Sequence, residues 1–111
     1  MAIVNAQLQA TQQTLLLVPN GKTYAITNIL VCNNSLSSDA IFDLHFVPPG
    51  DPVDNSVTRI INNLTLPATE TFTFDSERII LEAGDRIVFV AEPDIGGGLT
   101  NLSATVSYME L

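Results

Sequence analysis

The chain has 111 residues, a length suited to one domain, and its twelve acidic and four basic side chains give a net charge of −8 at pH 7. This balance argues against binding to nucleic acid or to an anionic membrane surface, because both repel an acidic protein. A single cysteine excludes an internal disulfide, and no apolar run approaches the ~20 residues that cross a bilayer.

Two further features of the composition bear on where the chain works. Its first residues lack the basic and apolar segments of a signal peptide, so we expect synthesis in the cytoplasm without export. Only 14% of the residues are charged while 46% are hydrophobic, a low charge density for a small domain. Either many residues are buried, or part of the apolar surface is covered by a partner.

Strand signals dominate the chain. Thr, Val, Ile and Phe are frequent, and Gly, Pro, Asn and Asp interrupt them at short intervals. No window has the i, i+3, i+4, i+7 apolar spacing and the caps of a helix. We therefore expect an all-β protein with about eight strands. The segments with strand character are residues 3–10, 14–18, 23–33, 40–47, 57–66, 69–75, 78–81, 86–91 and 100–111.

The segments between these strands have the chemistry of turns and loops. Proline and Asn-Gly in residues 19–22 favour a tight turn, and residues 33–39 form a polar loop. The prolines of residues 48–52 end a strand, because proline donates no hydrogen bond to a sheet. Residues 82–85 predict a second tight turn, and residues 93–98 predict a flexible loop tip.

Most of the expected strands alternate apolar and polar residues, which is typical of strands with one face in water. Phe72 and Phe74, for example, are expected to point inward while Asp75 points outward. The pattern predicts a single antiparallel β-sandwich over residues 1–111, either a jelly roll or an immunoglobulin-like domain. Alternation alone does not give the order of the strands.

Two segments, residues 29–32 and 87–90, are apolar on both faces. Either they are central strands covered on each side, or one face of each meets a neighbouring subunit. A sandwich of two sheets has one inner layer, so its strands should expose one face, and this favours a subunit interface. The candidate interface residues are Ile3, Ile29, Val31, Val88 and Val90.

Residues that could support catalysis or metal binding are few. His45 and Cys32, each the only residue of its type, lie on different expected strands with nothing to orient them, and together they cannot make a zinc site. Asp51, Asp54 and Asn55 share a loop with calcium-ligand chemistry, but Asx side chains that bond their own backbone are the favoured interpretation.

Two further clusters are better explained as turns. Glu82 and Asp85 flank an Ala-Gly pair, and an exposed turn does not provide the pKa shift that acid–base catalysis needs. Residues 96–98 are glycines that precede a strand and lack the lysine of a phosphate-binding loop. We therefore expect a non-enzymatic protein without a cofactor or a metal. The candidate exposed binding loops are those of Asn34, Asp51, Asp54 and Asp94.

Several short motifs follow one another over almost the whole chain. They read KTYAITNILVCN (22–33), FDLHFVP (42–48), INNLTL (61–66), TFTF (71–74), LEAGDRI (81–87) and LSATVSYME (102–110). In this order they resemble the small virion structural proteins of tailed phages, particularly those of the myoviruses of marine cyanobacteria. The resemblance implies an oligomeric β-sandwich in a capsid, neck, tail or fibre, and it brings no catalytic residues.

On this resemblance we expect a virion structural protein that decorates or cements the capsid, with a tail, baseplate or fibre component as the alternative. A receptor- or glycan-binding module would instead act through the loops at residues 34–39, 48–56 and 94–100. The expected partners are further copies of the chain, as closed trimers or hexamers, and other virion proteins. The N-terminal strand is a candidate for pairing with a neighbour's sheet edge. Neither nucleic acid nor a membrane is expected as a partner.

Overall fold

All regular structure among the described residues is β-strand. The computed structural model describes residues 2–74 and 79–111, and these form nine strands and no helix. Every strand begins and ends within two residues of an expected segment, whereas Asp75 and the expected strand start at Arg78 lie outside the described residues. The strands are β1 (Ala2–Gln9), β2 (Gln13–Leu17), β3 (Thr23–Asn33), β4 (Ala40–Val47), β5 (Arg59–Leu66), β6 (Thr71–Phe74), β7 (Ile79–Glu82), β8 (Arg86–Glu92) and β9 (Leu99–Glu110).

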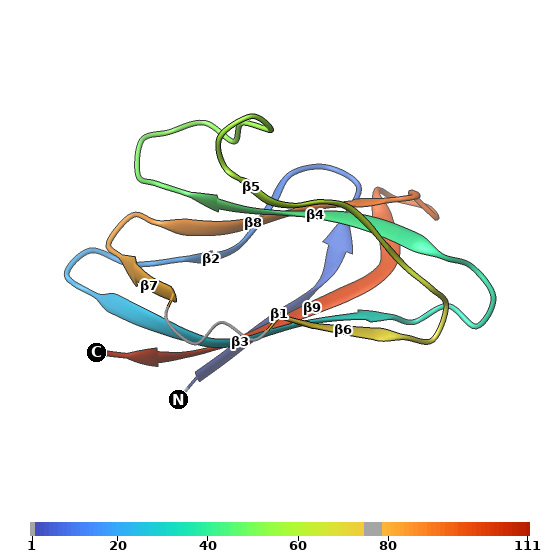
Figure 1. Ribbon diagram of the computed structural model, residues 1–111, viewed down its shortest axis with the longest axis horizontal. Coiled ribbons are helices and arrows are strands. Elements are labelled where there is room, and N and C mark those ends of the chain that lie inside the picture. Colours follow the sequence, from blue (N-terminus) through green and yellow to red (C-terminus); the bar gives the residue numbers. More distant parts are fainter. Residues whose placement is uncertain (1, 75–78) are drawn as a thin grey trace.

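The strands form two antiparallel sheets that pack face to face, seen as two layers in Figure 1. Sheet A has the order β1-β9-β3-β6, and sheet B has the order β2-β8-β4-β5. In sheet A, β6 pairs with Ile29–Cys32 of β3 and β7 pairs with Thr23–Ile26. Because β6 and β7 lie end to end along one edge of β3, nine strands fill eight positions.

The strand order decides between the two topologies that alternation left open. Consecutive strands lie in opposite sheets, except for the β4–β5 hairpin in sheet B and the β6–β7 pair in sheet A. An immunoglobulin-like sandwich keeps its first two strands side by side in one sheet. Here β1 and β2 enter different sheets, and β1 pairs with β9, the last strand. This interleaved order is that of a jelly roll.

The core lies between the sheets and is built from the inward half of each alternation. On β9, Leu102, Ala104 and Val106 are buried, while the residues between them are only half-buried, as the sequence predicts. Phe42 and Phe89 from sheet B meet at the centre with their ring centroids 6.2 Å apart. Burial of each such side chain stabilises the fold by about 1.5–3 kcal/mol, so the core accounts for the sandwich without a disulfide or a metal.

Two of the candidate interface residues belong to this core. Ile29 is 1% exposed and Val31 is 0% exposed, and both contact the buried cluster between the sheets. The prediction that they face a neighbouring subunit is therefore wrong. The outward residues of the same segment are Leu30 and Cys32, which are half-buried. The segment is apolar on both faces because Leu30 and Cys32 point outward while Ile29 and Val31 point into the core.

Candidate functional site

One end of the outer face of sheet B is covered by the chain itself. Val88 is only 1% exposed, yet it lies outside the buried cluster between the sheets, on the side of β8 that faces away from the core. Its cross-strand neighbour is His45 on β4. The β4–β5 loop (residues 48–58) rises over this end of the face, as seen at the upper left of Figure 1. Val88 is thus buried beneath a loop, and its predicted contact with another subunit is wrong.

A hydrogen-bonded group fixes this loop to the sheet. The buried Thr58 hydroxyl lies 2.9 Å from Nδ1 of His45 and accepts the Asp54 N–H at 3.0 Å. The hydroxyl donates its own proton to the Asp54 carbonyl, also at 3.0 Å. The hydroxyl therefore accepts a hydrogen bond from Nδ1–H of His45. The buried Nε2 has no partner among the described residues, so a proton there would be left unsatisfied, and this favours the neutral ring with its proton on Nδ1. His45 is a neutral structural residue here.

The electrostatics around His45 agree with the neutral form. Burial lowers the pKa of His45 below its usual range; the Asp43 carboxylate acts in the opposite direction, and the Arg59 guanidinium adds to the lowering. Asp43 itself accepts the Asn63 N–H at 2.6 Å and lies 3.7 Å from Arg59. The outer face of sheet B therefore carries opposite charges that are already paired within the chain.

The other end of the loop docks on the turn at residues 82–85. The Arg86 guanidinium donates to the Asp51 carbonyl at 2.8 Å. Gly84 has φ +89°, and a Cβ there would lie 2.6 Å from the Cβ of Pro49. The turn is closed by the Asp85 carboxylate, which accepts the Glu82 N–H at 2.8 Å. The predicted turn is confirmed, and its glycine is needed both for the backbone conformation and for the close approach of the loop.

The four residues that mark the candidate binding loops are all exposed, but they do not form one surface. The loops of Asn34 and Asp94 lie at one end of the sandwich, where Asn34 donates its N–H to the Asn101 carbonyl at the start of β9. Asp51 and Asp54 lie at the opposite end, because β4 runs the length of the sandwich between the two loops (Figure 1). A receptor site built from all three loops is not possible in this fold.

Two acidic side chains of these loops, Asp54 and Asp94, bond their own backbone. Asp54 accepts the Ser56 N–H at 2.8 Å, and Asp94 accepts the Gly96 N–H at 2.8 Å. For Asp54 this is the local Asx turn that the sequence favoured over a calcium site. Within residues 2–74 and 79–111, no group of three or more His, Cys, Asp or Glu side chains is placed to hold a metal.

Cys32 and His45 lie on the outward sides of different sheets, so the fold does not bring them together. Three surface hollows among the described residues have volumes of about 100 to 160 Å³. Sites for small organic ligands usually measure about 300–1,000 Å³. One hollow lies between the sheets at Phe46 and Leu81, and another is formed within the β4–β5 loop, by residues that include Asp51 and Val57.

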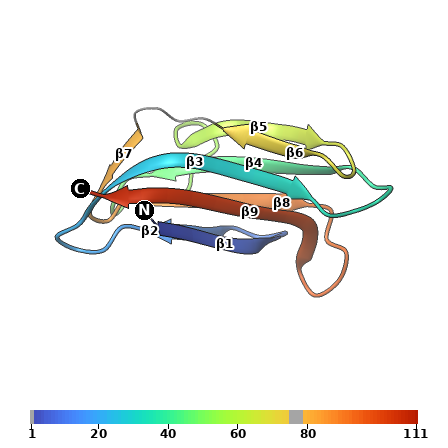
Figure 2. The same cartoon turned by 90° about the horizontal axis from the view of Figure 1, so that it is seen from below.

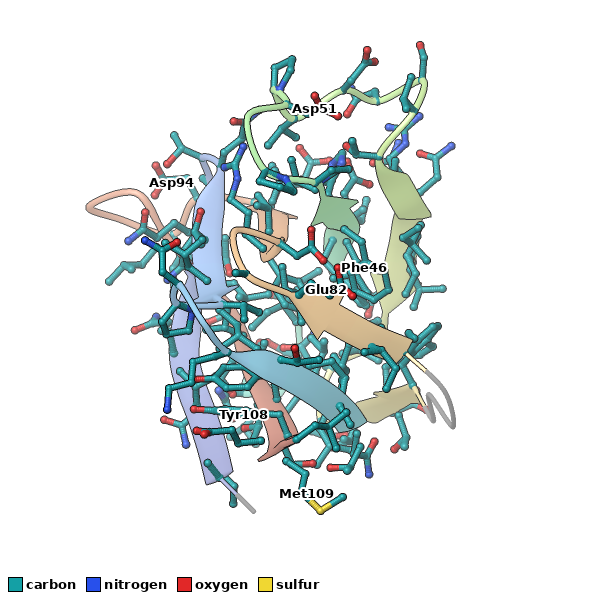
Figure 3. The ribbon with its side chains drawn as sticks, turned by 90° about the vertical axis from the view of Figure 1, so that its left-hand side faces the viewer. Phe46, Asp51, Glu82, Asp94, Tyr108 and Met109 are labelled. Atoms are coloured by element: carbon teal, nitrogen blue, oxygen red, sulfur yellow. The ribbon has the colours of Figure 1, made fainter. Side chains whose placement is uncertain are left out.

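The outer face of sheet A differs in both charge and cover. We define the uncharged face as the outward side of residues 2–9, 23–33 and 99–109, which contain no Asp, Glu, Lys, Arg or His. Its middle is polar: the hydroxyls of Thr27 and Ser107 lie 2.7 Å apart across β3 and β9. Figure 3 shows this side at the bottom, with Met109 extending away from the sheet, and the β4–β5 loop with Asp51 at the top.

One end of the uncharged face is apolar. Ile3 is 65% exposed and Met109 is 43% exposed, and Ile80 on the adjacent β7 is 50% exposed. The register brings them together, because Ala25 pairs with both Met109 and Ile80, while Ile3 pairs with Ser107. Ile3 is thus an exposed apolar residue within an apolar patch, and the subunit interface there stays a prediction. Val90, the remaining candidate, is half-buried on the outer face of sheet B.

Sequence reasoning missed Met109 and Ile80 as surface candidates. Met109 follows Ser103, Thr105 and Ser107 at the alternate positions that point outward. An apolar residue among these polar ones could have marked Met109 as an exposed surface residue. Ile80 gave no such signal, since its position depends on the pairing of β7 with β3.

Comparison of the chain with protein-family models, curated proteins and solved structures gives no significant match. None of the described residues belongs to a helix that is long and apolar enough to cross a membrane.

Proposed function

We propose that this chain is a structural protein of a tailed-phage virion, an oligomeric jelly-roll module that decorates or cements the capsid. The uncharged face of sheet A carries the proposal. In a chain of net charge −8, this face spans three adjacent strands without a charged side chain. Interface centres are depleted in charged residues, because a charge buried without a partner is costly. Another acidic chain can approach this face with the least repulsion.

Two further observations support the proposal. The order of the sequence motifs resembles small virion structural proteins, and the strand order is that of a jelly roll. Jelly rolls occur in viral capsid domains and also in lectins, so the fold agrees with a structural role by analogy and does not distinguish it from glycan binding. Glycan binding is the weaker candidate, because the loop of residues 48–56 lies at the opposite end of the sandwich from the other two loops (Figure 1) and cannot act with them.

Immunogold labelling of intact phage particles with an antibody against this chain tests the proposal. Labelling over the heads is the expected result. Labelling confined to the tail or its fibres would replace capsid decoration with the adsorption apparatus, within the same structural class. Particles that carry no label, whether intact or opened, would contradict a virion role. Particles grown without the gene for this chain serve as the control for antibody specificity.

A matched pair of variants tests the uncharged face. Thr105→Glu places a carboxylate in the middle of the face, whereas Thr65→Glu places one at an exposed position on β5. We expect the amount of the Thr105→Glu chain bound to particles to be at least about tenfold lower than that of the Thr65→Glu chain. The reason is that a buried unpaired charge costs more than about 1.4 kcal/mol. Equal retention of both variants would exclude this face as the contact.

A further inference from the structure

We infer that β1 is the edge through which two copies of this chain join, pairing antiparallel about a two-fold axis so that sheet A continues from one copy into the next. The inference rests on the proposed role as an assembling module and names one surface and one partner for it. Figure 2 shows β1 at the border of sheet A, with β9 beside it and no strand on its other side.

The free edge of β1 is built to accept another strand. Its register with β9 runs unbroken over six residues, from Ala2 opposite Tyr108 to Gln7 opposite Ser103. In an antiparallel ladder, every second residue directs its N–H and C=O away from the paired strand. Among the described residues, β9 is the only strand that pairs with β1, so these groups form a row at the surface. Such a row is a template for a further strand.

The other sheet edges carry devices that discourage pairing. β2 has five residues and a register shift between Thr14 and Leu16, and β6 and β7 have four residues each. β5 begins with Arg59 and has two irregularities against β4, with Asn63 in the left-handed region at φ 49°. Short strands, charges and bulges are the usual protections of an edge. β1 contains no charge, proline or glycine, and among the described edge strands it alone combines this with an unbroken register over six residues.

The far end of β1 is fixed in place, which keeps this edge in register. The strand bulges at Leu8, whose carbonyl accepts the buried Thr100 hydroxyl at 3.0 Å. The Gln7 side chain donates to the Thr100 carbonyl at 2.8 Å. The six residues before the bulge are therefore held straight against β9 and need little ordering to receive a partner. Pre-ordered surfaces lose less entropy on association.

A second copy fits this edge because the strand is complementary to itself. With a two-fold axis at Asn5, Ile3 of one copy lies opposite Gln7 of the other on the outer side, and Val4 lies opposite Ala6 on the inner side. Val4 and Ala6 pack only partly against the core, so a neighbouring strand would extend their cover. In a two-fold interface both copies contribute the same patch, and here each copy contributes the same free edge of β1.

Charge also favours a second copy at this position. Two chains of net charge −8 repel each other, and the repulsion is smallest where neither surface carries charge. β1 has no charged residue, and β9 next to it has none before Glu110, which pairs with Lys22 at 3.0 Å. The β1 edge and the uncharged face together give an approach free of facing carboxylates.

The mass of the full chain in solution tests the inference. We expect light scattering to give about 24 kDa or a multiple of it, from the chain's 12.0 kDa. Asn5→Lys should raise the dissociation constant of the pair at least about tenfold, because a lysine on an edge blocks pairing and two of them would face each other at the axis. The same change reduces the net charge to −7, so general repulsion cannot explain a loss of assembly.

Ile60→Lys is the matched control, since Ile60 is exposed on β5, the edge strand of sheet B. It should leave the mass unchanged. A wild-type chain that stays at 12 kDa at millimolar concentration, or an Asn5→Lys chain that keeps its assembly, would overturn the inference. In the second case the chain still assembles, so the proposed virion role would survive and the contact would lie elsewhere. Labelling of particles by the wild-type chain tests that role independently.

Cross-linking gives a second measurement that does not depend on the lysine variant. In a Cys32→Ser background, Asn5→Cys places two thiols opposite each other at the axis, where Cα atoms about 4.5–5.5 Å apart suit a disulfide. We expect a disulfide-linked dimer under mild oxidation, whereas Ile60→Cys should form no disulfide link between copies. If none of Ile3→Cys, Asn5→Cys and Gln7→Cys links more than the Ile60 control, the β1 edge is not the contact.

Discussion

The outer faces of the two sheets differ in how their side chains are paired and covered. On sheet B, Asp43 and Arg59 pair with each other, and the β4–β5 loop covers His45 and Val88. On sheet A, the uncharged face of β1, β3 and β9 has no charged side chain and no covering segment among the described residues, and Ile3 is exposed. One end of the outer face of sheet B is covered by its own chain, whereas the uncharged face of sheet A is bare among the described residues.

This difference teaches that an apolar outward residue has no fixed meaning. Val88 and Ile3 both break the polar phase of their strands, yet Val88 is 1% exposed and Ile3 is 65% exposed. What separates them is a loop from another part of the chain. The comparison can be tested by changes that act on one face and not on the other.

The largest expected effect comes from a charge placed beneath the loop. Val88→Asp should lower the free energy of unfolding by more than about 4 kcal/mol, because it buries a carboxylate without a partner. Thr105→Asp, on the bare face, should change it by less than about 1 kcal/mol. Urea unfolding followed by circular dichroism measures both. A Val88→Asp chain as stable as the wild type would mean that the loop does not cover this face, and Val88 would return as a subunit contact.

A smaller loss is expected where the loop docks on the turn. Gly84→Ala should cost about 2–4 kcal/mol, because it adds the left-handed backbone penalty to a collision with Pro49. Gly21→Ala is the control, with φ +78° and open space around its Cβ, and it should cost about 1–2 kcal/mol. Thermal unfolding of the two variants measures the difference. Equal losses would show that the contact with Pro49 does not matter.

Removing one hydroxyl tests the anchor of the loop on sheet B. Thr58→Val keeps the shape of the side chain but removes the partner of His45 and of the Asp54 N–H. Leaving such groups buried and unpaired should cost about 1–3 kcal/mol. Thr73→Val, at an exposed position on β6, should stay within about 0.5 kcal/mol of the wild type. Chemical denaturation distinguishes them, and similar values for the two would argue against the anchor.

The mildest effect is a dependence on pH that belongs to His45. Its pKa is lowered in the folded chain, so the unfolded chain takes up a proton that the folded chain does not. The contribution of His45 to stability is therefore constant above the unfolded pKa of about 6.5 and decreases as the pH falls below that value. The stability difference between the wild type and His45→Asn should shrink between pH 7.5 and 5.5. A difference that grows toward acid pH would mean that the folded state prefers the charged ring.

Much of the fold could be predicted, because strand patterns are local. The β3 and β4 boundaries were predicted to the residue, and the inward and outward phases of β9 followed from alternation. The candidate site was predicted less well. Ile29 and Val31 were assigned to the surface because both faces of their segment are apolar, although only the neighbouring sheet decides which face is covered. Ile3 lies at an exposed position, and its place in a subunit interface stays a prediction.

The sequence by itself determined the all-β character, the positions of the strands, and the absence of charge from residues 2–9, 23–33 and 99–109. These properties depend on neighbouring residues and on side-chain chemistry. The tertiary structure alone decided the jelly-roll order, the burial of Val88 beneath residues 48–58, and the position of β1 at an unprotected edge. Each of these depends on contacts between residues that are far apart in the chain, and alternation with a period of two contains no information about them.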